Sequence, residues 1–283
     1  MPDPLPPPDA RALPDLLVTG TDTGIGKTII AAALVKALRA RGVRALGFKP
    51  LETGFTASSG SPARSGATPP PGQATLAPAL DSELLARASG ETTPLAAPLL
   101  QLAEPLAPAV AAERAGTAVR PELIEARIDL IRRAGYTLVV EGAGGVMVPL
   151  VFHRPHAPLP IAWPFYTVLD LAAHRGLHAI VVGRPGLGTL NHVALTVAML
   201  RSRNIPVKAV ILNGRRPAPL ALSPEPDLAE STNPSALARM LPDVLIIQVP
   251  LHDLARSPAG ALATIDALAI IDATVPFLRQ LFL

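Results

Sequence analysis

The sequence predicts an α/β fold, in which a mostly parallel sheet is covered by helices on both faces as a three-layer structure. Short apolar runs alternate along the chain with segments of helical periodicity. Most of these runs are apolar throughout, as is typical of parallel strands that are buried on both faces. Hydrophobic residues make up 49% of the chain, which indicates a globular protein rather than a disordered one.

The first half of the chain supplies three of the strands. Residues 16–19 and 45–48 are apolar and read as short strands, and residues 28–41 between them read as a helix. Helical periodicity recurs at residues 81–88, 105–115 and, most clearly, 121–134. The buried-type strand at residues 137–140 then ends at an acidic residue. We therefore expect alternating strands and helices from residue 16 onward.

The second half of the chain continues the alternation. Residues 168–175, 190–203 and 235–240 read as helices, and residues 179–182, 207–212 and 244–249 read as strands. A broken helix is expected over residues 261–281. Ligands of such sheets bind at the carboxyl ends of the strands, which is where the polar motifs described below lie.

The glycine-containing loop at residues 20–28 (GTDTGIGKT) lies between the first strand and the first helix. This order of strand, loop and helix is that of a phosphate-binding P-loop, so a P-loop NTPase-like fold is expected. Gly24 and Gly26 let the backbone approach phosphate oxygens, Lys27 reaches the β- and γ-phosphates, and the Thr28 hydroxyl binds Mg²⁺. The first glycine stands one residue earlier than usual, and the competing interpretation is a glycine-rich turn that caps an ordinary helix.

Composition excludes several classes of function. The chain of 283 residues has no cysteine, so disulfides, thiolate metal sites and thiol nucleophiles are excluded. The net charge is only +3 and aromatic residues make up 3%, which argues against a nucleic-acid interface. No apolar run is long enough for a membrane span, and the start of the chain does not read as a secretory signal. A cytoplasmic enzyme is therefore expected.

Three segments are rich in proline or in small polar residues. Residues 1–14 contain six prolines and read as a flexible tail, so one domain is expected over residues 15–283. Residues 57–78 read as a mobile surface loop, and residues 153–164 show neither a helical nor a strand period.

Charged residues follow two of the predicted strands. Lys49 comes directly after residues 45–48 and leads into Pro-Leu-Glu-Thr-Gly, which favours an anion site over a surface charge. Glu141 comes directly after residues 137–140 and precedes three glycines. In a P-loop protein a carboxylate at this place can bind or orient Mg²⁺, and the alternative is a solvated acid in a glycine-rich turn.

Three further positions are ambiguous from local chemistry alone. Asp81 reads as an acid in the first turn of a helix. Asn213 follows a strand and suits either an adenine edge or the start of a turn. The segment 183–192 follows another strand and opens a helix whose N–H groups suit a carboxylate or a phosphate, and His192 is as consistent with a surface residue as with a ligand.

Taken together, these motifs resemble the dethiobiotin synthetase family. The resemblance rests on residues 18–28 (VTGTDTGIGKT), 47–50 (GFKP) with 53–54 (TG), 103–108 (AEPLAP), 140–145 (VEGAGG) with 149–150 (PL), 186–192 (GLGTLNH) and 212–213 (LN). It spans residues 16 to about 250, which is most of the chain.

The resemblance implies an ATP-dependent ligase, a cyclo-ligase of biotin biosynthesis. In this family 7,8-diaminononanoate takes up CO₂ (or bicarbonate) as a carbamate on one amine, and ATP phosphorylates the carbamate. The second amine closes the ureido ring of dethiobiotin. Family members are homodimers, so a partner subunit is expected to complete the substrate site.

Position by position, the resemblance assigns roles to residues of this chain. The implied catalytic residues are Lys27 and Lys49. The implied nucleotide-binding residues are Thr23, Gly24, Ile25, Gly26, Lys27, Thr28, Ile29, Asn213, Val249, Pro250 and Leu251. The implied substrate-binding residues are Thr23, Lys49, Thr53, Gly144 and Gly145, with Gly188, Thr189, Leu190 and Asn191 from the partner subunit. The implied Mg²⁺ ligands are Thr28, Asp81 and Glu141.

The chain departs from the family pattern at Ala109, where a member often has histidine. Rival interpretations are weaker. Amidating ligases of the same P-loop branch use a catalytic cysteine, which the chain lacks. Partitioning-type switch ATPases use an extra lysine early in the P-loop, but Gly20 to Thr23 of this chain include no lysine. A degenerate paralogue does not fit the intact Lys27, Thr28, Lys49 and Glu141. The partitioning-type switch ATPase remains the alternative function for this chain.

Overall fold

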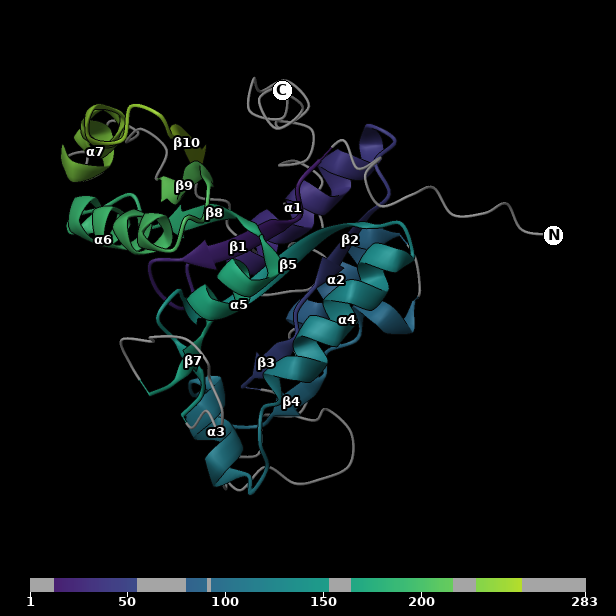
Figure 1. Ribbon diagram of the computed structural model, residues 1–283. Coiled ribbons are helices and arrows are strands. Elements are labelled where there is room, and N and C mark those ends of the chain that lie inside the picture. The colour runs from purple at the N-terminus through teal and green to yellow at the C-terminus, as the bar shows by residue number, and fades with distance from the viewer. Residues whose placement is uncertain (1–12, 55–79, 91–92, 153–163, 216–227, 251–283) are drawn as a thin grey trace, which may run out of the picture.

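A six-stranded, fully parallel sheet forms the centre of the protein, with strand order β10-β9-β8-β1-β5-β2 (Figure 1). The computed structural model describes residues 13–54, 80–90, 93–152, 164–215 and 228–250. The strands are β1 (Leu16–Gly20), β2 (Ala45–Phe48), β5 (Thr137–Gly145), β8 (His178–Gly183), β9 (Val207–Arg215) and β10 (Leu245–Pro250).

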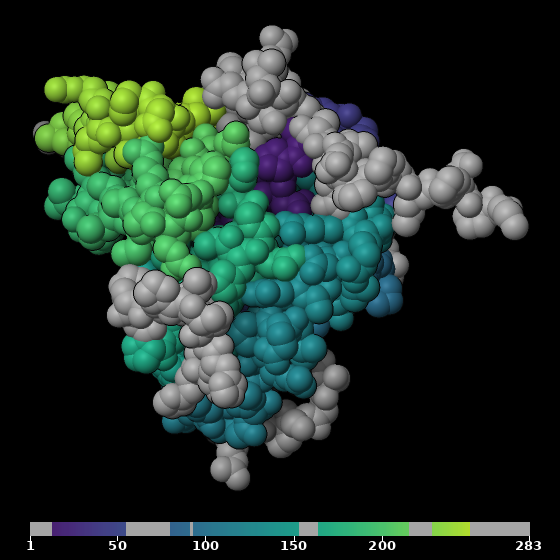
Figure 2. All heavy atoms as spheres, viewed as in Figure 1, coloured from purple at the N-terminus to yellow at the C-terminus, as the bar shows by residue number. Residues whose placement is uncertain are grey.

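Helices pack against both faces of this sheet. One face carries α1 (Lys27–Ala40) and α2 (Asp81–Ser89). The other carries α4 (Pro121–Arg133), α5 (Val168–Arg175), α6 (Thr189–Ser202) and α7 (Leu228–Met240), and in the space-filling view α6 and α7 form one continuous surface (Figure 2). No helix in the described ranges is long and apolar enough to cross a membrane.

Side-chain alternation in each strand builds two separate cores. In β1, Leu16 and Val18 pack on the α1 side, whereas Leu17 packs on the α4 side. In β5, Val139 faces α1, and Leu138 and Val140 face α4. Because successive side chains of a strand point to opposite faces, continuous apolar runs fill both cores at once.

Several short elements follow the carboxyl ends of β2 and β5. They are β3 (Leu51–Thr53), η2 (Pro94–Ala96), β4 (Leu100–Leu102), α3 (Pro108–Arg114), β6 (Pro149–Val151) and β7 (Tyr166–Thr167). β3 pairs with β4 in parallel, and β6 pairs with β7 antiparallel. These elements surround the space beyond the carboxyl ends of the central strands.

The predicted fold class is confirmed, and differences are confined to boundaries and short elements. β5 continues through Glu141 to Gly145, because Gly145 still pairs with Gly20 of β1. α3 begins at Pro108 rather than at residue 105, since a residue that precedes proline is forced out of the helical region, and Ala107 is extended. The strands β3, β4, β6 and β7 have two or three residues each and were not predicted.

Two further predictions differ from the structure. α7 begins at Leu228, well before the predicted residue 235, and runs through Pro234. Its first turn is supported by the Ser231 and Thr232 hydroxyls, which both donate to the Leu228 carbonyl. Leu13, which the sequence places in the tail, is buried and joins the core around α1. The segments 57–78 and 261–281 lie outside the described residues.

Candidate active site

The P-loop joins β1 to α1 and leaves the start of α1 open to an anion. Gly24 and Gly26 have φ angles of 69° and 87°, in the left-handed region that favours glycine. Gly26 is the N-cap of α1, where no side chain caps the helix and no acid stands in the first turn. The N–H groups of that turn and the helix dipole can therefore act on a phosphate.

Two side chains fix the shape of this loop. The Lys27 ammonium donates to the Asp22 carbonyl at 2.8 Å, so Lys27 folds back over the loop. The Asn213 amide, at the end of β9, donates to the Ile25 carbonyl at 2.8 Å. Burial lowers the pKa of Lys27, and the nearby Glu141 carboxylate partly offsets that effect. The loop is thus held in shape by contacts within the protein.

Strand register explains why Lys49 and Glu141 meet. Phe48 of β2 pairs with Val140 of β5, so the next residues, Lys49 and Glu141, stand side by side. Both point to the α1–α2 side, because they follow residues that face the other core. The helices α1 and α2 begin at this same edge of the sheet and bring Thr28 and Asp81.

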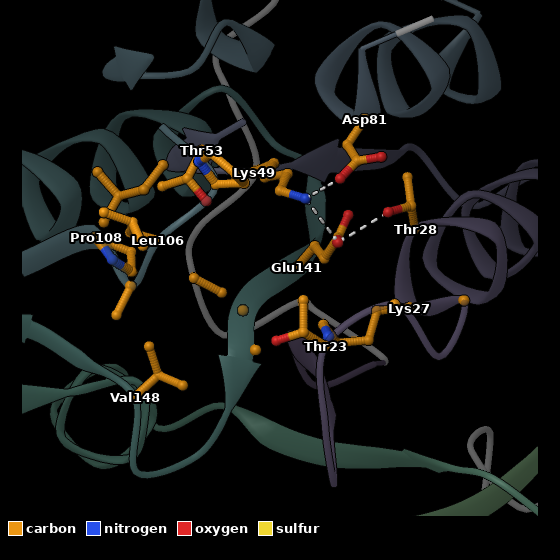
Figure 3. A pocket seen from close by; sticks show the side chains of 18 of the residues that line it. Thr23, Lys27, Thr28, Lys49, Thr53, Asp81, Leu106, Pro108, Glu141 and Val148 are labelled. Atoms are coloured by element: carbon orange, nitrogen blue, oxygen red, sulfur yellow. Dashed lines mark hydrogen bonds and ion pairs between the residues drawn. The ribbon is translucent and has the colours of Figure 1, made fainter. Parts of the chain in front are cut away.

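These four side chains form one polar cluster (Figure 3). The Thr28 hydroxyl and the Lys49 ammonium both donate to Glu141 Oε1, each at 2.9 Å. Lys49 is also ion-paired with Asp81. Glu141 is only 2% exposed, whereas the Asp81 side chain is 41% exposed. The cluster therefore joins four elements that are far apart in the sequence.

For both Lys49 and Glu141, burial and the neighbouring opposite charge shift the pKa in opposite directions. Burial lowers the pKa of Lys49, but the Glu141 and Asp81 carboxylates outweigh it and raise that pKa above its ordinary value. Lys49 is therefore a cation throughout the neutral range. Burial also raises the pKa of the Glu141 carboxyl, and the Lys49 ammonium counteracts that rise.

The oxygen atoms of the cluster have the chemistry that a hard divalent cation requires. Thr28, Asp81 and Glu141 offer hydroxyl and carboxylate oxygens only, which is the ligand type of Mg²⁺. Glu141 Oε2 is buried and makes no hydrogen bond. Within the described ranges no group of three or more His, Cys, Asp or Glu residues could hold a metal. Two carboxylates are nevertheless enough for Mg²⁺, which takes its remaining ligands from water and substrate phosphates.

A cavity of about 480 Å³ opens beside this cluster. Its polar wall is formed by the P-loop and the cluster, and its opposite wall by Thr53, Leu106, Pro108 and Val148 (Figure 3). Of the residues predicted for the site, the cavity is lined by Thr23, Gly24, Gly26, Lys27, Thr28, Ile29, Lys49, Thr53, Asp81, Glu141 and Gly144. Gly144 has a φ of 65°, and a Cβ there would lie 2.8 Å from Val148 Cγ2, so glycine is required.

Other predicted site residues lie beside the cavity rather than in its wall. Ile25 belongs to the P-loop and is buried, and Gly145 packs on the Gly20 carbonyl. Val249 of β10 is buried and pairs with Asn213 of β9. The backbone of Pro250 belongs to β10, and Leu251 lies outside the described residues. Asn213 thus contacts the P-loop, Val249 lies beside it in the sheet, and neither residue lines the cavity.

The segment Gly188–Asn191 lies at the start of α6 and does not line the cavity. Gly188, with a φ of 91°, is an N-cap without a side-chain hydrogen bond. The Thr189 hydroxyl is buried without a hydrogen-bond partner. The preceding loop is anchored by Asn233, whose amide donates to the Pro185 and Gly186 carbonyls at 2.8 and 2.9 Å. Leu187 on this loop is 95% exposed.

Sequence reasoning missed several residues around the site. Leu106, Pro108 and Val148 line the cavity. Leu106 and Pro108 belong to the segment 103–108 of the family resemblance, which assigned them no role, and Val148 lies outside the motifs. Glu52 is buried behind the cluster, where it accepts hydrogen bonds from Ser82 and Gln101. An acid in a three-residue strand carries no local pattern that would reveal such a role.

The chain is similar to a known family model and to solved structures. Residues 15–258 match a family model described as an AAA domain. Among solved structures, the nucleotide-binding protein from Archaeoglobus fulgidus in complex with ADP covers 94% of this chain and 90% of its own, with a TM-score of 0.42 and 12% identity.

Curated relatives are much more similar in sequence. The ATP-dependent dethiobiotin synthetase BioD of Anaeromyxobacter dehalogenans (strain 2CP-C) is 40% identical over 227 residues, which cover 80% of this chain and 84% of the relative. The protein of the same name from Thermodesulfovibrio yellowstonii is 35% identical over 79% of this chain and 83% of its own length. These alignments are long enough to include most of the described core.

Proposed function

The chain belongs to the ATP-dependent dethiobiotin synthetase family, and from this membership and its cavity we propose that it converts 7,8-diaminononanoate, CO₂ and ATP into dethiobiotin. It is a ligase of biotin biosynthesis. The observation that carries the proposal is Lys49, a buried cation that two carboxylates hold beside a P-loop and a substrate-sized cavity. Such a cation is needed where a carbamate and a phosphoryl group, both anionic, must meet.

The reaction has three steps, and in each the charges of the cavity have a defined task. An amine nitrogen of the diamine attacks CO₂ through its lone pair and loses a proton, which gives a carbamate beside Lys49. A carbamate oxygen then attacks the γ-phosphorus of ATP, and the bond to the β-phosphate oxygen breaks to release ADP. Lys27 and the N–H groups of the P-loop stabilise the charge on the phosphates. The second amine finally attacks the carbamate carbon and loses a proton, and the bond from that carbon to the phosphate oxygen breaks, so that phosphate leaves as the ureido ring closes.

Mg²⁺ is proposed as the metal of the site, held by Thr28, Asp81 and Glu141. When bound, it neutralises charge on the ATP phosphates. Glu141 Oε2, buried without a hydrogen bond, supports this assignment, because a buried carboxylate oxygen needs a partner. We further propose that Asn213 presents its amide oxygen to adenine while its nitrogen stays on Ile25, with residues 249–251 beside it.

We propose a homodimer in which α6 of one subunit reaches the cavity of the other. Gly188–Asn191 do not line the cavity of their own subunit, yet the uncapped start of α6 suits the substrate carboxylate. Leu187 and Leu195 are 95% and 62% exposed, and such apolar side chains suit a subunit interface. A cytoplasmic location, where ATP is supplied, belongs to the same proposal.

The purified protein is expected to release phosphate from ATP only when diaminononanoate and bicarbonate are both present. Each single omission should reduce the rate to background, because without a carbamate there is no acceptor for the phosphoryl group. Phosphate release measured with each substrate omitted in turn tests this. ATP hydrolysis that needs no diamine and rises with DNA or lipid would instead support the partitioning-type nucleotide switch.

Asn191→Asp is expected to raise the KM for diaminononanoate by about tenfold or more and to leave the KM for ATP unchanged. The new carboxylate would repel the substrate carboxylate at the start of α6.

Subunit mixing tests the shared site directly. At diaminononanoate concentrations well below the native KM, an equal mixture of Asn191→Asp and Lys49→Ala subunits should show roughly a quarter of the native activity, since about half of the dimers are mixed and each of these contains one intact site. A mixture no more active than the mean of its two components would contradict the shared site.

A further inference from the structure

Glu52 forms a buried hydrogen-bond network behind the polar cluster. It lies in β3, three residues after Lys49, and is only 4% exposed. Its Oε2 accepts from the Ser82 hydroxyl at 2.8 Å and from the Gln101 amide at 3.1 Å, and its Oε1 accepts from the Ser82 N–H at 3.3 Å. A buried carboxylate is tolerated here because three donors satisfy it.

These contacts replace the cap that α2 lacks. The N-cap residue of α2 is Leu80, which has no side-chain hydrogen bond to offer. The first N–H groups of a helix have no partner within the helix, and an acceptor with negative charge at that end is stabilising. Glu52 supplies this acceptor from another element. It thereby ties the first turn of α2, where Asp81 stands, to the segment that carries Lys49.

The other end of α2 is tied to the same segment. The Ser89 hydroxyl accepts from the Gly47 N–H of β2 at 3.0 Å and donates to the Leu85 carbonyl at 2.8 Å. A Cβ on Gly47 would lie 3.0 Å from Leu85 Cβ, so the helix lies directly on the strand. With both ends fixed, α2 has one position along β2 and β3.

We propose that Glu52 is a positioning residue that sets the affinity of the site for its divalent cation through Asp81. This inference rests on the proposed Mg²⁺ ligands. The Asp81 carboxylate is paired with Lys49, but its side chain is 41% exposed, so the place of its oxygens depends on the backbone of α2. Outer hydrogen bonds of this kind change metal affinity by about 10–100-fold when they are removed.

The direct test is the binding of Mn²⁺, a spectroscopic substitute for Mg²⁺, to the protein with a non-hydrolysable ATP analogue. Electron paramagnetic resonance of free Mn²⁺ gives its Kd without any turnover. Glu52→Ala is expected to weaken Mn²⁺ binding by about tenfold or more. Glu52→Gln, which keeps an oxygen for the Ser82 N–H and can donate to the Ser82 hydroxyl, should restore most of the affinity.

Asp15→Ala is the matched control. Asp15 is also a buried carboxylate that accepts a backbone N–H, from Leu138 at 2.7 Å, but it lies before β1, at the opposite edge of the sheet from the cavity. Its loss should lower the free energy of unfolding and leave the Kd for Mn²⁺ unchanged.

The outcomes separate this inference from the proposed function. Weaker Mn²⁺ binding in Glu52→Ala, with rescue in Glu52→Gln, supports the positioning role. Native affinity in a folded Glu52→Ala protein overturns that role and leaves the metal site intact. If Glu52→Ala does not fold, Ser82→Ala removes one of the three hydrogen bonds, and native affinity there overturns the inference as well. Failure of the unaltered protein to bind Mn²⁺ overturns the proposed metal site itself.

Discussion

Lys49→Ala is expected to reduce dethiobiotin formation by about a hundredfold to a thousandfold, while ADP still binds nearly as tightly as before. The Lys49 ammonium is the cation that Asp81 and Glu141 hold toward the cavity, and its hydrogen bonds within the described residues go to these two carboxylates and not to the P-loop. In the proposed mechanism, nucleotide binding depends instead on Lys27 and the N–H groups of the loop. Phosphate release and calorimetric titration with ADP separate the two effects.

The same substitution also has a cost in stability. Without Lys49, the carboxylate of Glu141 stays buried with only the Thr28 hydroxyl as a donor. Removing one member of a buried ion pair costs about 3–5 kcal/mol in the free energy of unfolding. Mg²⁺ with ADP should restore part of this loss, since a ligand that binds only the folded state stabilises it. Denaturant unfolding with and without Mg²⁺ and ADP measures that recovery.

Lys208→Ala is the control for the loss of a lysine in general, because Lys208 lies in β9 and does not line the cavity. It should keep native turnover. A Lys49→Ala protein that is folded and turns over at the native rate would contradict the role given to Lys49. A folded variant that has lost ADP affinity would mean that Lys49 serves the nucleotide rather than the carbamate.

The pairing of Lys49 with Glu141 shows why part of the site could be predicted from the sequence. Each residue directly follows an apolar strand, and the carboxyl ends of neighbouring parallel strands meet at one edge of a sheet. The sequence thus places each residue at the carboxyl end of a strand, whereas the structure shows that β2 and β5 are neighbours and that Lys49 and Glu141 therefore meet. The P-loop was predictable for a similar reason, because its strand, loop and helix are contiguous in the sequence.

Asp81 and Glu52 show why the rest could not be predicted from local pattern. Asp81 reaches the cluster only because α2 packs on β2, and α2 is separated from that strand by a long stretch of chain. Local chemistry gave it no more than a place in the first turn of a helix, and only the family resemblance indicated a ligand. Glu52 depends on the pairing of β3 with β4, which brings Gln101 within reach. Strands of three residues are too short for a reliable period.

Gly26→Ala is expected to weaken nucleotide binding by on the order of a hundredfold. Its φ of 87° is a conformation that costs alanine about 1–2 kcal/mol. In addition, a Cβ at this position would lie 2.1 Å from Asn213 Nδ2, far inside van der Waals contact. Asn213 could yield only by giving up its hydrogen bond to the Ile25 carbonyl, and that bond holds the P-loop. Titration with ADP measures the loss.

Gly42→Ala is the control for backbone strain without a steric overlap. Gly42 follows the C-terminal end of α1, has a φ of 79°, and has no atom within 4 Å of the position that a Cβ would take. The substitution should cost about 1–2 kcal/mol in the free energy of unfolding and leave ADP affinity unchanged. The overlap is tested by the double variant Gly26→Ala with Asn213→Ala. If Asn213 is the obstacle, its truncation relieves the clash, and the two substitutions together weaken ADP binding less than the product of their separate effects. Strictly multiplicative effects would show instead that the left-handed backbone alone requires glycine at this position.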